Sequence, residues 1–174
     1  MNFIPTKLQG VWIIEPQPHK DERGFFARTF CAQEFGTHAL ADRFVQCNTS
    51  WNARKGTVRG LHYQLPPASE VKLVRCTAGA LLDVIVDLRP DSPTYLQSTS
   101  VQLTATNRLA LYIPQMFAHG FQTLEDGTEI FYQMSEFYEP KLKRGLRYND
   151  PKLGINWPLS VASISEQDLG WPSL

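Results

Sequence analysis

The sequence predicts an all-β domain in which short antiparallel strands form a sandwich or barrel. Runs rich in Val, Ile, Phe and Tyr recur along the chain and are separated by turn residues. Two turn signals, Ala78-Gly79 and Glu125-Asp126-Gly127, are typical of β-hairpins, because glycine supplies the positive φ that tight turns need. Helical patterns are confined to two short segments, which we expect at the periphery.

The strand pattern recurs from the first residues of the chain to its last third. Each run is short, and in each run β-branched and aromatic residues dominate or alternate with polar ones. In chain order the predicted strands cover residues 11–15, 25–30, 44–50, 57–64, 71–77, 80–88, 96–103, 108–113, 120–124 and 128–137. Helices are expected over residues 32–40 and after Ser163, where Ser165 and Asp168 have the spacing of an N-terminal cap.

Length and composition are those of one folded unit. The chain has 174 residues, of which 43% are hydrophobic, so we expect a single domain over residues 1–174 with one full core. Lys plus Arg and Asp plus Glu both number 17, which gives a formal net charge of zero. This balance disfavours binding to nucleic acid or to anionic membranes. An anionic ligand would have to meet a local basic cluster.

The cysteines and the N-terminus predict a cytoplasmic protein. Cys31, Cys47 and Cys76 form no Cys-x-x-Cys motif, and an odd number fits no disulfide framework. Buried thiols in a reducing compartment are the expectation. The first residues contain no long apolar segment after a basic start, and no window approaches the ~20 apolar residues of a membrane span.

One part of the chain brings a guanidinium, an imidazole and an ammonium onto neighbouring predicted strands. These groups belong to Arg59, His62 and Lys72. A neutral imidazole can take a proton near pH 7. A fixed cation nearby can hold the negative charge that is left behind. The cluster therefore predicts proton abstraction next to a carbonyl, on a substrate that carries its own negative charge.

Strand alternation gives further expectations about side-chain direction. It places Lys72 among small apolar neighbours, which suggests that it points into a partly lined cavity. It also places Arg59 and His62 on opposite faces, so Gly60 is expected to mark a bulge that re-aims Arg59. Asp83 shares a face with a second aspartate four residues on, Asp87, and both are expected to face solvent.

The histidines separate into two kinds. His19 and His38 lie in polar surroundings and are expected to be solvated. His62 and His119 lie beside aromatic residues and glycine, which fits either hydrogen-bonded core histidines or a site. Gln64 stands where a His-x-His metal motif would need its second histidine, so no metal site is expected.

Other kinds of catalysis lack their motifs. The chain contains no Gly-x-Ser-x-Gly, no Cys-His signature, no Gly-x-Gly-x-x-Gly and no phosphate loop, which disfavours nucleophilic catalysis and a bound nicotinamide or ATP. Acid–base chemistry remains. Tyr132 and Tyr138 are candidate general acids, with aromatic core packing as the alternative for each. Position in the chain does not identify the carboxylate that would orient a histidine base.

Nine segments, taken in order, carry a specific resemblance. They are residues 21–26 (DERGFF), 46–48 (QCN), 56–64 (GTVRGLHYQ), 72–76 (KLVRC), 83–89 (DVIVDLR), 113–122 (IPQMFAHGFQ), 129–135 (EIFYQMS), 148–151 (YNDP) and 155–158 (INWP). Together they resemble the dTDP-4-dehydrorhamnose 3,5-epimerase family over nearly the whole chain. The resemblance implies a cupin-like jelly roll, a double-stranded β-helix barrel with short peripheral helices. It also implies a homodimer that works without metal or dissociable cofactor.

The resemblance assigns a role to each catalytic candidate. The substrate would be a nucleotide-linked 4-keto-6-deoxy sugar, with dTDP as the nucleotide. His62 would remove the protons from C3 and then C5, with Asp168 as its dyad partner. Lys72 would stabilise the enolate oxygen at C4. Tyr132 would return a proton to the opposite face of the ring.

The resemblance also assigns the contacts that bind the substrate. Tyr138 falls where the family stacks the nucleotide base. Arg23 and Phe26 lie on N-terminal strands that are expected to reach into a neighbouring barrel. The other substrate-contacting positions are Gln46, Asn48, Arg59 and His119.

Some positions depart from the family pattern, and several activities share this framework. Arg28 stands where rhamnose-pathway members often have glutamate, and Lys143 and Gln167 also differ from the usual residues. All three are expected near the part of the site that binds the nucleotide, so the identity of the nucleotide stays open. The alternatives to a 3,5-epimerase are an epimerase of C3 or C5 alone, a 3,4-ketoisomerase, a non-catalytic sugar-nucleotide-binding cupin and, more weakly, a metal-dependent cupin.

Overall fold

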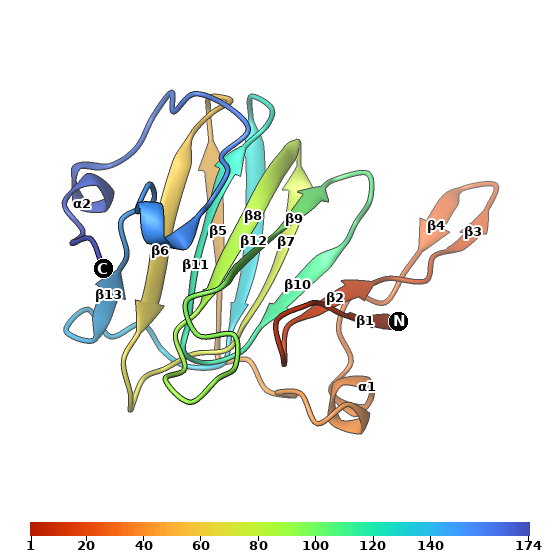
Figure 1. Cartoon of the computed structure of the whole chain (residues 1–174). Helices are drawn as coiled ribbons and strands as arrows, with labels where there is room; N and C mark the ends of the chain where they lie inside the picture. Colours follow the sequence, from red (N-terminus) through yellow and green to blue (C-terminus); the bar gives the residue numbers. More distant parts are fainter.

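Two antiparallel sheets face each other in the computed structural model, which describes all residues, 1–174 (Figure 1). The six-stranded sheet contains, in spatial order, β1 (Asn2–Pro5), β2 (Trp12–Glu15), β10 (Ala110–Ile113), β7 (Lys72–Ala78), β12 (Thr128–Met134) and β5 (Gln46–Asn52). The five-stranded sheet contains β13 (Lys143–Gly145), β6 (Val58–Gln64), β11 (Phe117–Thr123), β8 (Ala80–Asp87) and β9 (Ser98–Thr104). This arrangement confirms the predicted all-β jelly roll.

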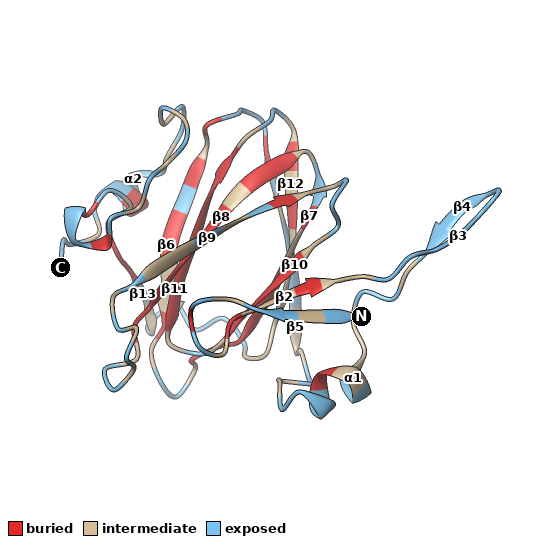
Figure 2. Ribbon diagram, turned by 45° about the vertical axis from the view of Figure 1, so that its right-hand side comes forward, coloured by how far each residue is buried: buried red, intermediate tan, exposed pale blue.

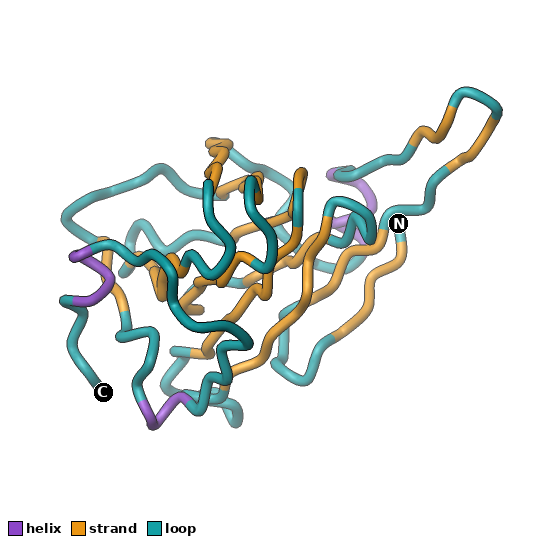
Figure 3. Tube along the Cα trace, turned by 90° about the horizontal axis from the view of Figure 1, so that it is seen from above, coloured by secondary structure: helices purple, strands orange, loops and turns teal.

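The remaining elements are short and lie outside the two sheets (Figure 3). Strands β3 (His19–Asp21) and β4 (Gly24–Phe26) form a hairpin that projects away from the sheets (Figures 1 and 3). The helices are α1 (Ala32–Thr37), the 3-10 turn η1 (Pro151–Leu153) and α2 (Glu166–Leu169). None of them combines the length and apolar character that crossing a bilayer requires.

Every predicted strand region contains a strand, and three strands were not predicted. These are β1, β3 and β13. The sequence of β13, Lys143-Arg144-Gly145, has no apolar residue, and its strand form comes from pairing with β6. The predicted strand over residues 25–30 was too long, because β4 ends at Phe26. The predicted helix over residues 32–40 was also too long, because α1 ends at Thr37.

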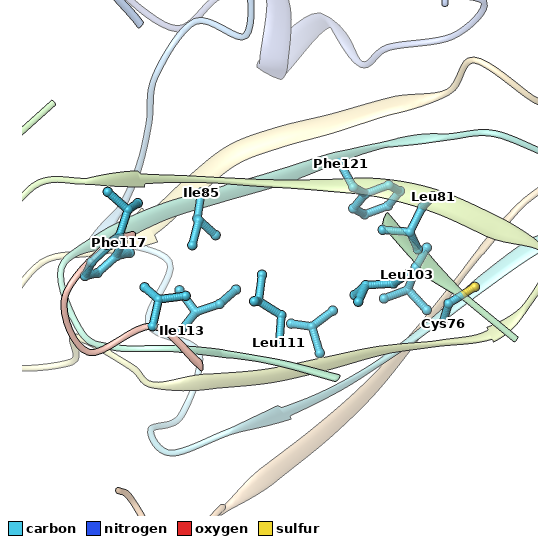
Figure 4. Packing of buried hydrophobic residues seen from close by; sticks show 12 residues of the cluster. Cys76, Leu81, Ile85, Leu103, Leu111, Ile113, Phe117 and Phe121 are labelled. Atoms are coloured by element: carbon cyan, nitrogen blue, oxygen red, sulfur yellow. The ribbon is translucent and has the colours of Figure 1, made fainter. Parts of the chain in front are cut away.

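The main core fills the space between the sheets (Figure 4). It contains apolar side chains from both sheets and from the turn before β2, and Phe117 and Phe121 are its largest members. Burying this many apolar side chains is the dominant favourable term in the stability of such a fold. The full set is Leu8, Val11, Val74, Cys76, Leu81, Ile85, Leu103, Leu111, Ile113, Phe117, Phe121 and Ile130.

Both sheets are also covered on part of their outer faces, and β8, β10 and β11 beneath these covers are buried along nearly their whole length (Figure 2). Phe35 of α1 packs on the outside of the six-stranded sheet, against Leu73 and Tyr112. Leu146 and Leu153, from the segment after β13, pack on the outside of the five-stranded sheet.

The expectation that Asp83 and Asp87 face solvent was wrong. Both residues have no exposed surface. They share the inner face of β8 with Ile85, while Val84 and Val86 pack outward under the C-terminal segment. Asp87 accepts hydrogen bonds from Arg89 and Ser92, and it anchors the loop that follows β8.

The expected irregularity at Gly60 is present. His62 pairs with His119 and Arg59 pairs with Phe121, so two residues of β6 lie opposite Gly120 alone. This bulge cancels the alternation that would have separated Arg59 from His62. Gly60 has φ +128°, and a Cβ there would lie 2.5 Å from the Gly120 Cα. Only glycine fits this crossing of β6 and β11.

Replacing Gly60 with alanine should therefore destabilise the protein beyond the cost of its backbone conformation. Overpacking costs about 1–3 kcal/mol, so we expect a loss of that size in the free energy of unfolding measured with denaturant. Gly24→Ala is the matched control, because Gly24 has φ +131° but nothing within 4 Å of its Cβ position. A loss at Gly60 no larger than that at Gly24 would contradict the steric argument.

Candidate active site

A cavity of about 450 Å³ opens between the two sheets, on the side where β5 and β13 form their edges. Its size is within the range of small-molecule sites. The six-stranded sheet contributes side chains from β5, β7 and β12, and the five-stranded sheet contributes β6, β11 and β13. The lining residues are Gln46, Asn48, Thr49, Ser50, Arg59, His62, Tyr63, Gln64, Glu70, Lys72, His119, Gly120, Phe121, Tyr132, Met134, Glu136, Tyr138 and Lys143.

His62 and Asp168 form a hydrogen-bonded dyad on the wall made by the five-stranded sheet. His62 Nε2 lies 2.5 Å from Asp168 Oδ1. The carboxylate also accepts hydrogen bonds from the backbone N–H of Gly60 at 3.2 Å and from Trp171 Nε1 at 3.3 Å. Asp168 lies on α2, and the Ser165 side chain caps that helix as predicted. Because Nε2 donates to Asp168, Nδ1 is the nitrogen that remains to accept a proton.

The surroundings of the dyad keep the imidazole neutral and the carboxylate ionised. Burial lowers the pKa of His62 below its ordinary 6.5, and the nearby ammonium groups of Lys143 and Lys72 lower it further, whereas Asp168 opposes the shift. Burial would raise the pKa of Asp168, but hydrogen bonds from His62, Gly60 and Trp171 outweigh it and leave that pKa below its ordinary value. At neutral pH His62 is therefore an uncharged base.

Lys72 is an ammonium held in a nearly dry position. Its side chain is 8% exposed. The Nζ atom lies 2.9 Å from Glu70 Oε1 and donates to the His62 carbonyl oxygen at 3.1 Å. The prediction that Lys72 points into a lined cavity is confirmed.

Tyr132 lies on β12 in the other sheet, so the cavity separates it from the His62 side of the site. Burial raises the pKa of its hydroxyl, and the negative charge of Asp83 adds to this shift. The hydroxyl is therefore protonated at neutral pH. Its ring meets the His119 ring edge to face, with centroids 6.2 Å apart.

A second histidine–carboxylate pair, which sequence reasoning missed, lies deeper in the cavity wall. His119 Nε2 lies 3.0 Å from Asp83. His119 is 4% exposed and Asp83 is fully buried. Alternation placed Asp83 and Ile85 on one face of the strand. It did not show that this face points into the core, so the pair with His119 could not be predicted.

Polar side chains line the part of the cavity toward β5. Arg59 Nε donates to Asn52 Oδ1 at 2.7 Å, and Gln46 Nε2 donates to Asn48 Oδ1 at 3.2 Å. Tyr138 is 54% exposed, and its backbone N–H donates to Gln46 at 3.3 Å. This end of the cavity can offer hydrogen bonds and a positive charge to an anion.

The structure brings most of the predicted site residues together, and two lie elsewhere. Eight of them line the cavity, and Asp168 lies directly behind His62. Arg23 and Phe26 lie on the projecting β3–β4 hairpin, where they do not line this cavity. The eight are Gln46, Asn48, Arg59, His62, Lys72, His119, Tyr132 and Tyr138.

The three residues that depart from the family pattern do not lie together in the structure. Lys143 lines the cavity, and its Nζ donates to Gln167 Oε1 at 2.8 Å. Arg28 instead forms an ion pair with Glu34 of α1 at 2.8 Å and does not line the cavity. Glu70 and Lys143 line the cavity, although sequence reasoning gave neither a catalytic or binding role.

The other two histidines, His19 and His38, lie outside the cavity. His19 and His38 are exposed, which confirms that they are solvated. The chain's His, Cys, Asp and Glu side chains form no group of three or more that could hold a metal ion.

Comparison with known proteins identifies the family. The family model described as dTDP-4-dehydrorhamnose 3,5-epimerase matches residues 5–174. The chain belongs to this family. Its members are named for an isomerase activity, and the resemblance drawn from the nine sequence segments is therefore confirmed.

The epimerase relatives match this chain along almost their full length. The dTDP-4-dehydrorhamnose 3,5-epimerase of Methanothermobacter thermautotrophicus is 44% identical, covering 99% of this chain and 94% of its own. The crystal structure of the Bacillus anthracis enzyme with TDP and pyrophosphate bound has a TM-score of 0.96 at 39% identity and covers 99% of each chain. The Legionella pneumophila epimerase in complex with dTDP-4-keto-L-rhamnose has a TM-score of 0.90 at 40% identity, covering 96% of this chain and 89% of its own.

The charges around His62 lead to a prediction about its titration. In Asp168→Asn the group that raises the pKa of His62 is lost, so that pKa should fall further below 6.5. In Lys143→Gln a group that lowers it is lost, so the pKa should rise. Proton NMR of the imidazole Cε1–H against pH measures both, with His62→Asn to assign the signal. Shifts in the same direction in the two variants would contradict this account.

Proposed function

We propose that this chain is a cofactor-independent epimerase that inverts C3 and C5 of dTDP-4-dehydro-6-deoxy-D-glucose to give dTDP-4-dehydro-L-rhamnose. The observation that carries the proposal is the placement of His62 and Tyr132 on the two facing sheets, with Lys72 in the same cavity. Inversion needs a base on one face of the sugar ring and an acid on the other.

In the first step His62 acts as the base. A C–H next to the C4 ketone is a weak acid, and Nδ1 of the neutral imidazole takes its proton. Asp168 fixes the tautomer and stabilises the imidazolium that forms, because its carboxylate already accepts the Nε2–H. General acid–base groups of this kind typically contribute about 10²–10⁴-fold to a rate.

Lys72 stabilises the enolate. Removal of the proton moves an electron pair onto the C4 oxygen, and an ammonium at that oxygen lowers the energy of the transition state more than that of the ketone. Lys72 is 8% exposed, so little water screens this interaction.

Tyr132 completes the inversion. Its hydroxyl transfers a proton to the carbon from the opposite face, and the electron pair returns from the C4 oxygen to that carbon. The imidazolium then holds the proton taken from the sugar, and the tyrosinate has lost one. Exchange with water restores both groups before the second carbon reacts.

The polar end of the cavity fits the nucleotide part of the substrate. Arg59, Gln46 and Asn48 would bind the diphosphate, His119 would contact the sugar, and the half-exposed Tyr138 ring would stack on the base. The Bacillus anthracis relative has TDP and pyrophosphate bound, which supports a thymidine nucleotide.

The proposal includes a homodimer with shared sites and a cytoplasmic location. The Phe26 side chain is 74% exposed on the projecting hairpin, and the Arg23 side chain is 84% exposed. An aromatic ring and a guanidinium presented away from their own barrel are suited to a second copy's cavity. The three cysteines are unpaired, which agrees with a reducing compartment. The expectation that all three are buried was wrong, because Cys47 lies on the exposed edge strand β5 and Cys31 is partly exposed, and only Cys76 is in the core. In this proposal residues 1–174 form one epimerase domain.

Solvent exchange tests the reaction. In D2O the wild-type protein should introduce deuterium at C3 and C5 of dTDP-4-keto-6-deoxyglucose, followed by NMR, and His62→Asn should reduce the rate about 10²–10⁴-fold. The cytidine-linked sugar in parallel tests the nucleotide. No exchange at either carbon would overturn the proposal, exchange at C3 alone would indicate a mono-epimerase, and a migrated carbonyl would indicate a ketoisomerase.

Mixing two inactive variants tests the shared site. One is His62→Asn, and the other carries Arg23→Ala and Phe26→Ala. If each hairpin completes the partner's cavity, a mixed dimer has one site with both His62 and an intact hairpin, so activity should return after joint refolding. Sedimentation should show a dimer throughout. A mixture that stays as inactive as its components would argue that the hairpin does not act in the partner's site.

A further inference from the structure

The residue that holds the Lys72 ammonium is Glu70, which lies just before β7 and lines the cavity. Glu70 Oε1 is 2.9 Å from Lys72 Nζ, and the two side chains are 5% and 8% exposed. A charge-assisted contact in such dry surroundings is stronger than one at the surface.

The contacts of Lys72 within the chain do not use all of its donors. An ammonium group has three N–H donors. The His62 carbonyl oxygen accepts one of them at 3.1 Å, and the Glu70 carboxylate lies against the ammonium as an ion pair. No other acceptor of this chain contacts Lys72, so N–H donors remain for a ligand in the cavity that Lys72 lines.

We propose that Glu70 is a positioning residue, which fixes the Lys72 ammonium so that a free N–H meets the C4 oxygen of the substrate. This inference rests on the proposed function of the site. A lysine has a flexible four-carbon stem and can turn its donors freely. The ion pair with Glu70, on the segment before β7, and the hydrogen bond to His62, on β6, restrict that freedom before the substrate arrives. The binding energy of the substrate is then not needed to align the Lys72 ammonium.

The other oxygen of Glu70 indicates that the ion pair adds little net stability to the fold. Oε2 is buried and has no hydrogen-bond partner. A buried acceptor without a partner is costly, and a buried ion pair is weak evidence for stability. Neutral residues at both positions 70 and 72 would avoid burying any charge, so the carboxylate is explained by the ammonium that it holds.

A double-mutant cycle tests the proposal in the exchange assay. Glu70→Gln should lower kcat about 10–100-fold, the size expected for a misaligned catalytic group, with KM within about twofold. In a Lys72→Met background the same change should alter kcat by less than about twofold, because Glu70 then has no ammonium to position. The double variant buries neither charge, so it should keep a cooperative thermal transition.

Several results would overturn it. One is wild-type kcat in Glu70→Gln, and another is the same fold-loss from Glu70→Gln in both backgrounds, which would mean that Glu70 acts independently of Lys72. If Lys72→Met does not fold, Glu70→Asp decides. The shorter side chain keeps the charge but not the reach, so positioning predicts a reduced kcat, and an unchanged kcat contradicts it. Wild-type exchange at C3 and C5 is measured separately, so a failure of the proposed function is distinguishable.

Discussion

The space between the two sheets is largely shielded from solvent, and a charged group persists there only when another group compensates it. Desolvation of an isolated charge is far more costly than loss of an ordinary hydrogen bond. Three acid–base pairs meet this condition: His62 with Asp168, His119 with Asp83, and Lys72 with Glu70. The two histidine pairs join segments that are distant in the chain, and the Lys72–Glu70 pair lies at the start of β7. The cavity is therefore a region of the core in which polar groups compensate one another.

This constraint explains how stability and reactivity are combined. The apolar cluster of Leu, Ile, Val and Phe occupies one part of the inter-sheet space, and the cavity occupies the part toward the β5 and β13 edges. Parts of the outer faces are covered by α1 and by the segment after β13, so β6, β7 and β11, which carry His62, Lys72 and His119, are packed on their outer side as well. Close packing of this kind holds side chains in defined rotamers, which suits a site whose groups must keep a fixed geometry.

Local sequence was a good guide to the strands and a poor guide to the contacts between them. Turn residues and β-branched runs located the strands, because these signals act over a few residues. Strand β13 was missed because only its pairing with β6 makes it a strand. Asp83 was misplaced because alternation shows which residues share a face but not which way that face points. His62, Lys72 and Arg59 could be recognised as a cluster from neighbouring strands, whereas Asp168 came only from family resemblance, since it reaches His62 across 106 residues.

Trp171 gives the dyad an optical property. Its indole N–H donates to the same Asp168 oxygen that His62 contacts, and its ring centroid lies 6.3 Å from that of the imidazole. Indole emission is quenched by a nearby imidazolium far more than by a neutral imidazole. The fluorescence of this one side chain should therefore depend on the protonation state of the proposed base, so the fold contains an intrinsic spectroscopic reporter of its own acid–base chemistry.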